Sequence, residues 1–168
     1  MPEARRILYR RERRVSAAEI QRPDREIWIV HPHGQPVPSA VPEHVQVLLL
    51  DGSWSESSAM AREVTGWGRL VSLPMSGESR YWLRAKQEGS RFSTVEALLF
   101  LLDLFRLDAA SCALRLQFEL HVYASLRARG KKQRAEEFLQ TSPLRDALPE
   151  FLADLTASRR RGAGETST

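Results

Sequence analysis

A carboxylate and an indole follow directly after an apolar run. Residues 45–50 read VQVLLL, and Asp51, Gly52, Ser53 and Trp54 come next. An acid at the rim of a buried strand can be partly desolvated, which raises its basicity and suits it to proton transfer. A Trp three residues further on can offer a flat apolar wall to a ligand. The simpler alternative is that Asp51 or Ser53 only caps a following helix and that Trp54 packs in the core.

Two other apolar runs also end in residues that could line a site. Residues 26–30 (EIWIV) run into a predicted loop, His31-Pro32-His33-Gly34, and residues 69–73 (RLVSL) run into a loop over residues 74–81. His31 and His33 have metal-ligand spacing, but the sequence offers no third ligand nearby, so we predict no metal site. One functional interpretation is a hydrolase or other α/β enzyme that uses His31, His33 and Asp51, and it would require metal-dependent activity.

Two further groups of polar residues allow two interpretations each. Ser93-x-x-Glu96 before an apolar run is a capping box, and the same helix start could meet the carboxylate of a ligand. Arg80 and Arg84 could clamp a carboxylate or a phosphate bidentately, and the alternative is a surface ion pair.

The elements that must position these residues alternate between strand and helix. The three apolar runs predict strands, and VQVLLL is apolar enough for a parallel strand that is covered on both faces. Helices are predicted over residues 53–64, 94–107 and 110–129. The fold class is therefore α/β, with a mostly parallel sheet flanked by helices. In such sheets ligands bind beyond the carboxyl ends of the strands, where the three loops would meet.

The helix predicted over residues 110–129 has an amphipathic pattern. Its spacing predicts an inward stripe and an exposed face. The stripe comprises Leu114, Phe118, Val122 and Leu126, and the exposed face comprises Arg115, Glu119 and Arg127. Cys112, the single cysteine, is expected to be a small buried hydrophobe and excludes both an internal disulfide and a thiolate zinc site.

Length and composition fit one globular domain with appended ends. The chain has 168 residues, of which 42% are hydrophobic. We expect a core over residues 5–130, a helical extension over residues 131–157 and a disordered tail over residues 158–168. No apolar run reaches the ~18–20 residues of a membrane span, and the N-terminus lacks the apolar core of a secretory signal. We expect a cytoplasmic protein that has no membrane partner.

Basic residues outnumber acidic ones and gather in clusters. The chain has 25 Lys and Arg against 21 Asp and Glu, a net charge of +4. Such clusters can bind RNA by releasing counterions, and the alternative is that they are solvated helix faces and frayed ends. The clusters are Arg5, Arg6, Arg10, Arg11, Arg13 and Arg14; Arg127, Arg129, Lys131, Lys132 and Arg134; and Arg159 to Arg161.

Four motifs in order resemble the DTW-domain family. LLLDGSW, over residues 48–54, resembles its DxTW/DxSW signature, and WIVHPHGQPV matches the segment before it. After a strand that ends in Leu73-Pro74, residues 79–84 (SRYWLR) resemble the S-x-Y-x-L-R segment of the family. Residues 93–97 (STVEA) resemble its S-T-x-E-A helix start. The resemblance covers about residues 27–105.

The resemblance implies a reaction, a fold and a site. The family transfers the 3-amino-3-carboxypropyl group of S-adenosylmethionine to uridine N3 in tRNA, needs no metal for this step, and has a knotted core like that of SPOUT methyltransferases. Carried over, Asp51 would be the catalytic residue facing the uridine, and Trp54 would pack on the methionine part of the donor. The donor cleft would comprise Pro32, His33, Gly34, Leu73, Pro74, Ser93, Thr94 and Glu96. RNA contacts would come from Arg80, Tyr81, Arg84, Arg10 and Arg13.

The N-terminal segment departs from the family pattern. Family members carry zinc-binding cysteines and a His-Pro-x-Glu segment ahead of the core. Here the cysteines are absent, and ILYRRERR retains Glu12 while Tyr9 or Arg10 stands for the histidine. The alternative function is therefore a catalytically impaired relative that binds RNA or a nucleoside.

Overall fold

The computed structural model describes residues 4–9, 15–38, 40–84 and 91–154. The chain divides into two compact units. The sheet unit comprises Met1–Glu78 and Phe92–Leu107, and the helical unit comprises Ser79–Arg91 and Asp108–Thr168. Residues 5–130, which we expected to form one core, are therefore divided between the two units.

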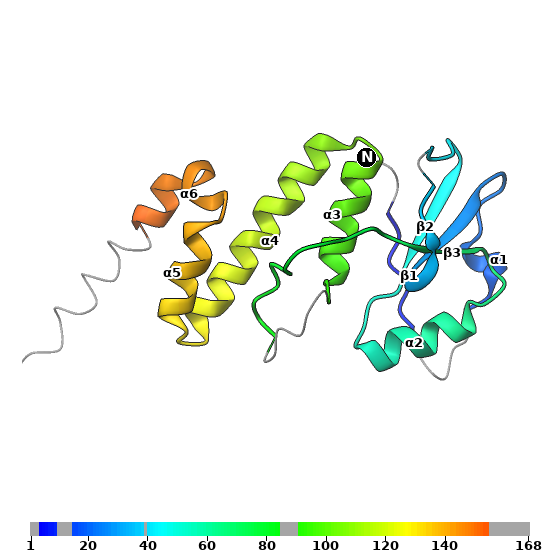
Figure 1. The fold of residues 1–168 in the computed structure, drawn as a ribbon, viewed down its shortest axis with the longest axis horizontal. Coiled ribbons are helices and arrows are strands. Elements are labelled where there is room, and N and C mark those ends of the chain that lie inside the picture. Colours follow the sequence, from blue (N-terminus) through cyan, green and yellow to red (C-terminus); the bar gives the residue numbers. More distant parts are fainter. Residues whose placement is uncertain (1–3, 10–14, 39, 85–90, 155–168) are drawn as a thin grey trace, which may run out of the picture. The chain divides into compact units, whose positions relative to one another are not determined.

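Three strands form a parallel sheet in the sheet unit (Figure 1). They are β1 (Glu26–Pro36), β2 (Val45–Leu49) and β3 (Arg69–Ser72), in the order β2-β1-β3. Both pairs, β1 with β2 and β1 with β3, are parallel, as predicted from the sequence. The carboxyl ends of the three strands therefore lie at one edge of the sheet.

The central strand is β1, and it is more deeply buried than β2. Ile27, Trp28 and Ile29 are each at most 2% exposed, and successive strand residues point to opposite faces, so β1 is covered on both sides. In β2 only Val45 is buried, and the rest of the strand is half-buried. VQVLLL is covered on both faces as predicted, although less deeply than β1. Val45 and Val47 pack in the cluster of Trp28, and Leu48 and Leu50 pack against the cluster of Ile27 on the other face.

β1 is also longer than predicted and includes His31 to Gly34, which we expected in a loop. The chain continues along β3: Gln35 pairs with Val71, and the Val37 amide donates to the Ser72 carbonyl at 3.1 Å. Val30 also pairs with Val71, so the pairing register shifts between Val30 and Gln35. A Cβ atom on Gly34 would lie 2.4 Å from the Val71 carbonyl carbon, so the strand can run here only because residue 34 is a glycine.

Helices α1 (Ala17–Ile20), α2 (Trp54–Glu63) and α3 (Thr94–Leu104) complete the sheet unit. Two hydrophobic clusters lie on opposite faces of β1, one around Ile27 and Ile29 and the other around Trp28. Val64 and Trp67, which follow α2, belong to the first cluster, and Phe105, which follows α3, belongs to the second. Helical segments thus cover both faces of the sheet, as expected of parallel strands.

The helical unit contains α4 (Asp108–Ala128), α5 (Lys132–Gln140) and α6 (Leu144–Ala147). Phe118, Val122 and Leu126 form the predicted buried stripe on α4, while Leu114 is only half-buried. Phe138 of α5 and Leu144 of α6 are fully buried as well.

Two residues of α4 differ from the sequence prediction. Glu119, expected to be exposed, is 4% exposed, and Cys112, expected to be buried, is exposed. Helical periodicity explains the burial of Glu119. Residues i, i+3 and i+4 share one side of a helix, and Val122 and Tyr123 are both buried. Arg115 is exposed as predicted, and Arg127 is half-buried.

Among the described helices, none is both long and apolar enough to cross a membrane. The knotted path implied by the family resemblance stays a prediction.

Candidate active site

A hydrogen bond joins the end of β2 to the start of α3. The Thr94 hydroxyl donates to Asp51 Oδ1 at 2.8 Å, across 43 residues of sequence. The signature carboxylate and the S-T-x-E-A helix start, which the resemblance assigned to one site, are therefore adjacent. Asp51 itself is exposed, so the predicted desolvation was wrong. The residue lies in a turn beyond the end of the strand, where water reaches the carboxylate.

Ser53, and not Asp51, caps α2. The Ser53 hydroxyl accepts a hydrogen bond from the Glu56 amide at 3.4 Å, and the Ser53 amide donates to Glu56 Oε2 at 2.7 Å. The Ser57 hydroxyl donates to the Leu50 carbonyl at 3.3 Å and ties the first turn of α2 to the end of β2. These bonds fix the turn that contains Asp51. Its carboxylate does not cap α2 and instead accepts the hydrogen bond from Thr94.

Trp54 is the first residue of α2, and its side chain is 48% exposed. The core-packing alternative for Trp54 was therefore wrong. Trp28, by contrast, is fully buried in the sheet. A half-exposed indole three residues from Asp51 offers an apolar surface beside a carboxylate, as a site for a ligand with apolar and polar parts requires.

The start of α3 is a complete capping box, as the sequence indicated. Glu96 is 8% exposed, and its Oε2 accepts from the Ser93 amide at 2.6 Å and from the Ser93 hydroxyl at 2.8 Å. The Glu96 amide donates back to Ser93 Oγ at 3.3 Å. The Glu96 carboxylate is thus committed to the helix cap. A donor-binding role for Ser93, Thr94 and Glu96 stays a prediction.

His31 to Gly34 lie beside the end of β3. The close approach of Gly34 to the Val71 backbone fixes this position. The rings of His31 and His33 are 5.3 Å apart, and the His33 amide donates to His31 Nδ1 at 3.2 Å. Burial, together with the neighbouring charge of His33, lowers the pKa of His31 below its usual value. Pro32 and His33 are exposed.

Leu73 and Pro74 follow β3 directly, at the same edge of the sheet. Leu73 is half-buried and Pro74 is exposed. Within the described residues, no three His, Cys, Asp or Glu side chains gather in a way that could hold a metal ion.

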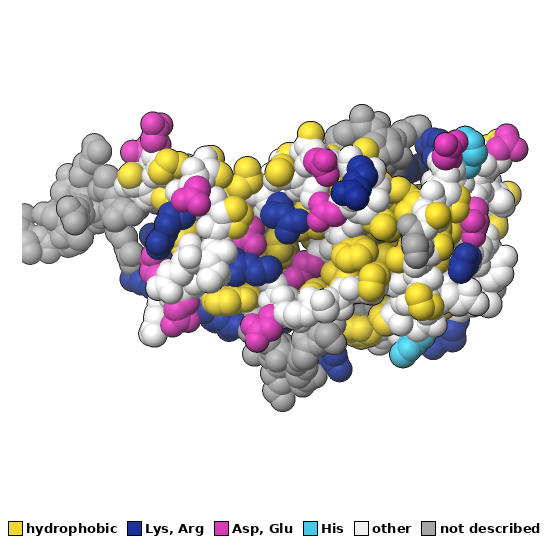
Figure 2. Space-filling view, turned by 45° about the horizontal axis from the view of Figure 1, so that its top comes forward, with side chains coloured by type: hydrophobic (Ala, Val, Ile, Leu, Met, Phe, Trp, Pro, Cys, Tyr) yellow, Lys and Arg dark blue, Asp and Glu magenta, His cyan; other side chains and the backbone are white. Residues whose placement is uncertain are grey.

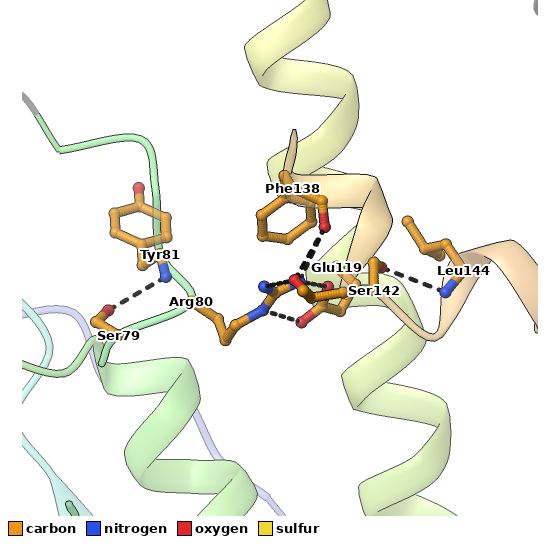
Figure 3. A network of polar contacts seen from close by, with 8 residues as sticks. Ser79, Arg80, Tyr81, Glu119, Phe138, Ser142 and Leu144 are labelled. Atoms are coloured by element: carbon orange, nitrogen blue, oxygen red, sulfur yellow. Dashed lines mark hydrogen bonds and ion pairs between the residues drawn. The ribbon is translucent and has the colours of Figure 1, made fainter. Parts of the chain in front are cut away.

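Arg80 belongs to the helical unit and has internal partners (Figure 3). Its Nε and Nη2 donate to the two carboxylate oxygens of Glu119 at 2.9 and 2.6 Å, and its Nη1 donates to Thr141 Oγ1 at 2.7 Å. The guanidinium carbon lies 4.0 Å from the centroid of the Phe138 ring. These contacts support the ion-pair alternative over a clamp for ligand or RNA, although the pair is largely buried and not on the surface.

The other predicted RNA contacts of this segment are also packed within the helical unit. Tyr81 stacks on Phe118 with ring centroids 6.3 Å apart. The Arg84 guanidinium lies 5.5 Å from the Tyr81 ring centroid and donates to the carbonyl of Arg91. Arg10 and Arg13 lie outside the described residues.

The partners of Arg80 were not predicted from the sequence. Glu119 was assigned to the exposed face of α4, although its i+3 and i+4 spacing to Val122 and Tyr123 could have indicated burial. Thr141 and Phe138 carry no comparable local signal, because their contacts with Arg80 span about 60 residues.

The fold and this edge define an α/β protein whose signature carboxylate lies where an outer strand of a parallel sheet ends. The chain matches the DTW domain over residues 2–128 and belongs to the DTW domain family. The match covers the strands and α1 to α4, whereas α5 and α6 lie beyond it. Neither the curated proteins nor the solved structures contain a match to this chain.

Proposed function

We propose that this protein transfers the 3-amino-3-carboxypropyl group of S-adenosylmethionine to N3 of a uridine in tRNA. The DTW domain family is associated with this reaction. The observation that carries the proposal is the hydrogen bond between Asp51 and Thr94, because it joins two family motifs at the carboxyl edge of the sheet. The exposed Trp54 at the same turn supports it.

The proposed step forms one bond and breaks one. Uridine N3 gives up its proton and attacks the γ-carbon of the methionine part, and the carbon–sulfur electron pair leaves with methylthioadenosine. S-adenosylmethionine supplies an activated leaving group, so the protein has mainly to align the reactants and accept a proton. Alignment contributes on the order of 7–11 kcal/mol, and one proton-transfer group typically about 10²–10⁴-fold.

Asp51 is the proposed proton acceptor. Thr94 holds Oδ1, which orients the carboxylate so that Oδ2 can accept the N3 proton. The Thr94 bond is then a positioning contact, while Asp51 touches the reacting base.

The donor substrate fits the surroundings of Asp51. The Trp54 indole can pack on its aliphatic chain, and the capped N-terminus of α3, an 11-residue helix, presents backbone N–H groups to its carboxylate. His33, Gly34 and Pro74 lie at the same edge and would complete the donor cleft.

The test is release of methylthioadenosine on bulk tRNA. We expect Asp51→Asn to lower turnover by about 10²–10⁴-fold while calorimetric affinity for S-adenosylmethionine stays within about twofold. Thr94→Val should lower turnover less, because it removes only the positioning contact. Glu43→Gln, an exposed acid of the sheet unit, is the matched control and should retain full activity. Absence of release by the wild-type protein, or full turnover by Asp51→Asn, would refute the proposal.

One observation favours the alternative function, a relative that binds without catalysis. Tyr9, one of two residues that can stand for the family's histidine, donates its hydroxyl to Glu63 Oε1 at 2.7 Å. This contact ties the N-terminal segment to α2 and gives Tyr9 a structural role. The alternative predicts that calorimetry detects binding of S-adenosylmethionine or RNA while no methylthioadenosine appears.

A further inference from the structure

The turn between α4 and α5 has an unusual concentration of positive charge. Residues 120–135 hold five basic residues and no acidic one. The remainder of the chain holds 20 basic and 21 acidic residues, so this short segment accounts for the net positive charge of the protein. Figure 2 shows acidic and basic side chains interspersed over the helices of the helical unit, which makes a run of one sign stand out.

Four of these side chains lie in the turn or in the first turn of α5, and we name this set the cationic turn: Arg129, Lys131, Lys132 and Arg134. Gly130 adopts a φ of 72°, and the Lys131 amide donates to the Leu126 carbonyl at 2.9 Å, so the chain reverses sharply between the helices. Gly130 and the residues from Lys131 to Arg134 line an open depression, together with Glu137.

The two arginines of the cationic turn are held in place from within the helical unit. Arg129 Nη1 donates to the Leu83 carbonyl at 3.1 Å, and the Arg134 guanidinium lies 5.6 Å from the Trp82 ring centroid. Within the described ranges, these two arginines contact a carbonyl and an aromatic ring and form no ion pair with an acid. The two lysines are exposed and supply mobile charges beside these fixed ones.

One nearby acid pairs with a residue outside the cationic turn, and another lines the depression. Glu136 pairs with Arg127 at 3.8 Å, which lies outside the cationic turn. Glu137 accepts a hydrogen bond from Gln133 Nε2 at 3.1 Å and is the acidic member of the depression. Among the described residues, no acid lies within ion-pair distance of Lys131 or Lys132.

The chemistry of the turn fits a phosphate backbone. Between the buried Leu126 and the buried Ala135 the chain carries no large hydrophobic side chain, so it lacks the anchors for membrane insertion or for the core of a protein interface. What remains is a local cluster of cations, the pattern of sequence-independent nucleic-acid binding.

We propose that the cationic turn binds the phosphate backbone of the RNA substrate. This inference rests on the proposed function for the identity of the RNA. All four residues, and α5 itself, lie beyond residue 128, where the DTW match ends. The RNA contact therefore belongs to a part of this chain that the family domain does not include.

The experiment measures the affinity for bulk tRNA by fluorescence anisotropy at several salt concentrations, without S-adenosylmethionine. The variant Lys131→Gln/Lys132→Gln removes two exposed charges, and Arg62→Gln/Arg145→Gln, two exposed arginines elsewhere, is the matched control. We expect the variant to lose about 1–2 units of the slope of log K against log salt and about tenfold in affinity, because each phosphate contact contributes about 0.9 to the slope. The control should lose less than half as much of the slope.

Two results would overturn the inference. The first is an unchanged slope and affinity in Lys131→Gln/Lys132→Gln, with folding confirmed by circular dichroism. The second is that the wild-type protein binds vesicles of anionic phospholipid, or polyglutamate, more tightly than it binds tRNA. A salt slope that depends on the lysines but no methylthioadenosine release would support the RNA surface and refute the transferase. Release of methylthioadenosine together with unchanged tRNA affinity in the lysine variant would support the transferase and refute the RNA surface.

Discussion

Removing the Arg80 guanidinium leaves a carboxylate buried without its cation. The Glu119 side chain is 5% exposed, and both of its oxygens accept hydrogen bonds from Arg80. Breaking a buried ion pair by removing one partner costs about 3–5 kcal/mol, because the remaining charge is neither hydrated nor compensated. We therefore expect Arg80→Ala to reduce the free energy of unfolding of the helical unit by about that amount.

The same geometry predicts that a double substitution is milder. Replacing both members by apolar residues removes the stranded charge, and such replacements are often neutral. Arg80→Leu/Glu119→Leu should then be at least about 2 kcal/mol more stable than the sum of the two single substitutions predicts. Urea unfolding, with amide hydrogen exchange followed for peptides of α4 and α5, measures the change in the helical unit separately from the sheet unit.

The control is Arg145→Ala, which changes an exposed arginine of α6 and should stay within about 0.5 kcal/mol of the wild type. A loss below about 1 kcal/mol in Arg80→Ala would refute the reasoning, since Glu119 would then be solvated without its partner. Additive single substitutions would refute it as well.

Three further predictions concern the sheet unit and α4. Gly34→Ala should destabilise the sheet unit by at least about 1–3 kcal/mol in urea unfolding, because its Cβ would overlap the Val71 backbone; an unchanged midpoint would contradict this. Trp54→Ala should change stability by less than about 1 kcal/mol, since the indole is 48% exposed, but should weaken calorimetric binding of S-adenosylmethionine; unchanged binding would remove Trp54 from the site. Cys112 should react fully with iodoacetamide in native buffer, as mass spectrometry would show, and a requirement for urea would mean that it is buried.

Local patterns predicted much of the fold. The strands at residues 26–30, 45–50 and 69–73 and the helices that became α2, α3 and α4 lie where the sequence placed them. Short-range hydrophobic spacing and caps determine these elements, and both can be read from neighbouring residues. The parallel pairing followed from the alternation of strand and helix.

The features that the sequence did not predict depend on distant partners. The continuation of β1 past His31 to Gly34 depends on β3, because Gln35 and Pro36 pair with Val71 and Ser72, about 35 residues later. The half-burial of β2 depends on its place in the strand order. Glu119 is buried because Arg80, 39 residues earlier, compensates its charge. The first two features are not encoded within a window of a few residues, and the partner of Glu119 is not either, although its helical spacing to Val122 and Tyr123 could have indicated burial.

The candidate site was predicted in part by family motifs. The family motifs assigned Asp51 and the helix start at Ser93-Thr94 to one site. In the structure, the Thr94 hydroxyl donates a hydrogen bond to Asp51. The exposure of Asp51 and Trp54 could not be read from residue type, since both types occur buried and exposed. Arg80 lies in a family motif, but its guanidinium forms an ion pair with Glu119 inside the helical unit.

The pairing of β1 beyond Val30 determines which part of the edge can adapt to a ligand. His31 to Gly34 lie between Val30 and Gln35, which both pair with Val71 of β3, and Gly34 is in close contact with the Val71 backbone. Residues 73–78 follow the last strand without regular structure, and Gly77 has a φ of 90° with open space around its α-carbon. A conformational adjustment to a ligand at this edge therefore requires the least free energy in residues 73–78, whereas β1 is held against β3.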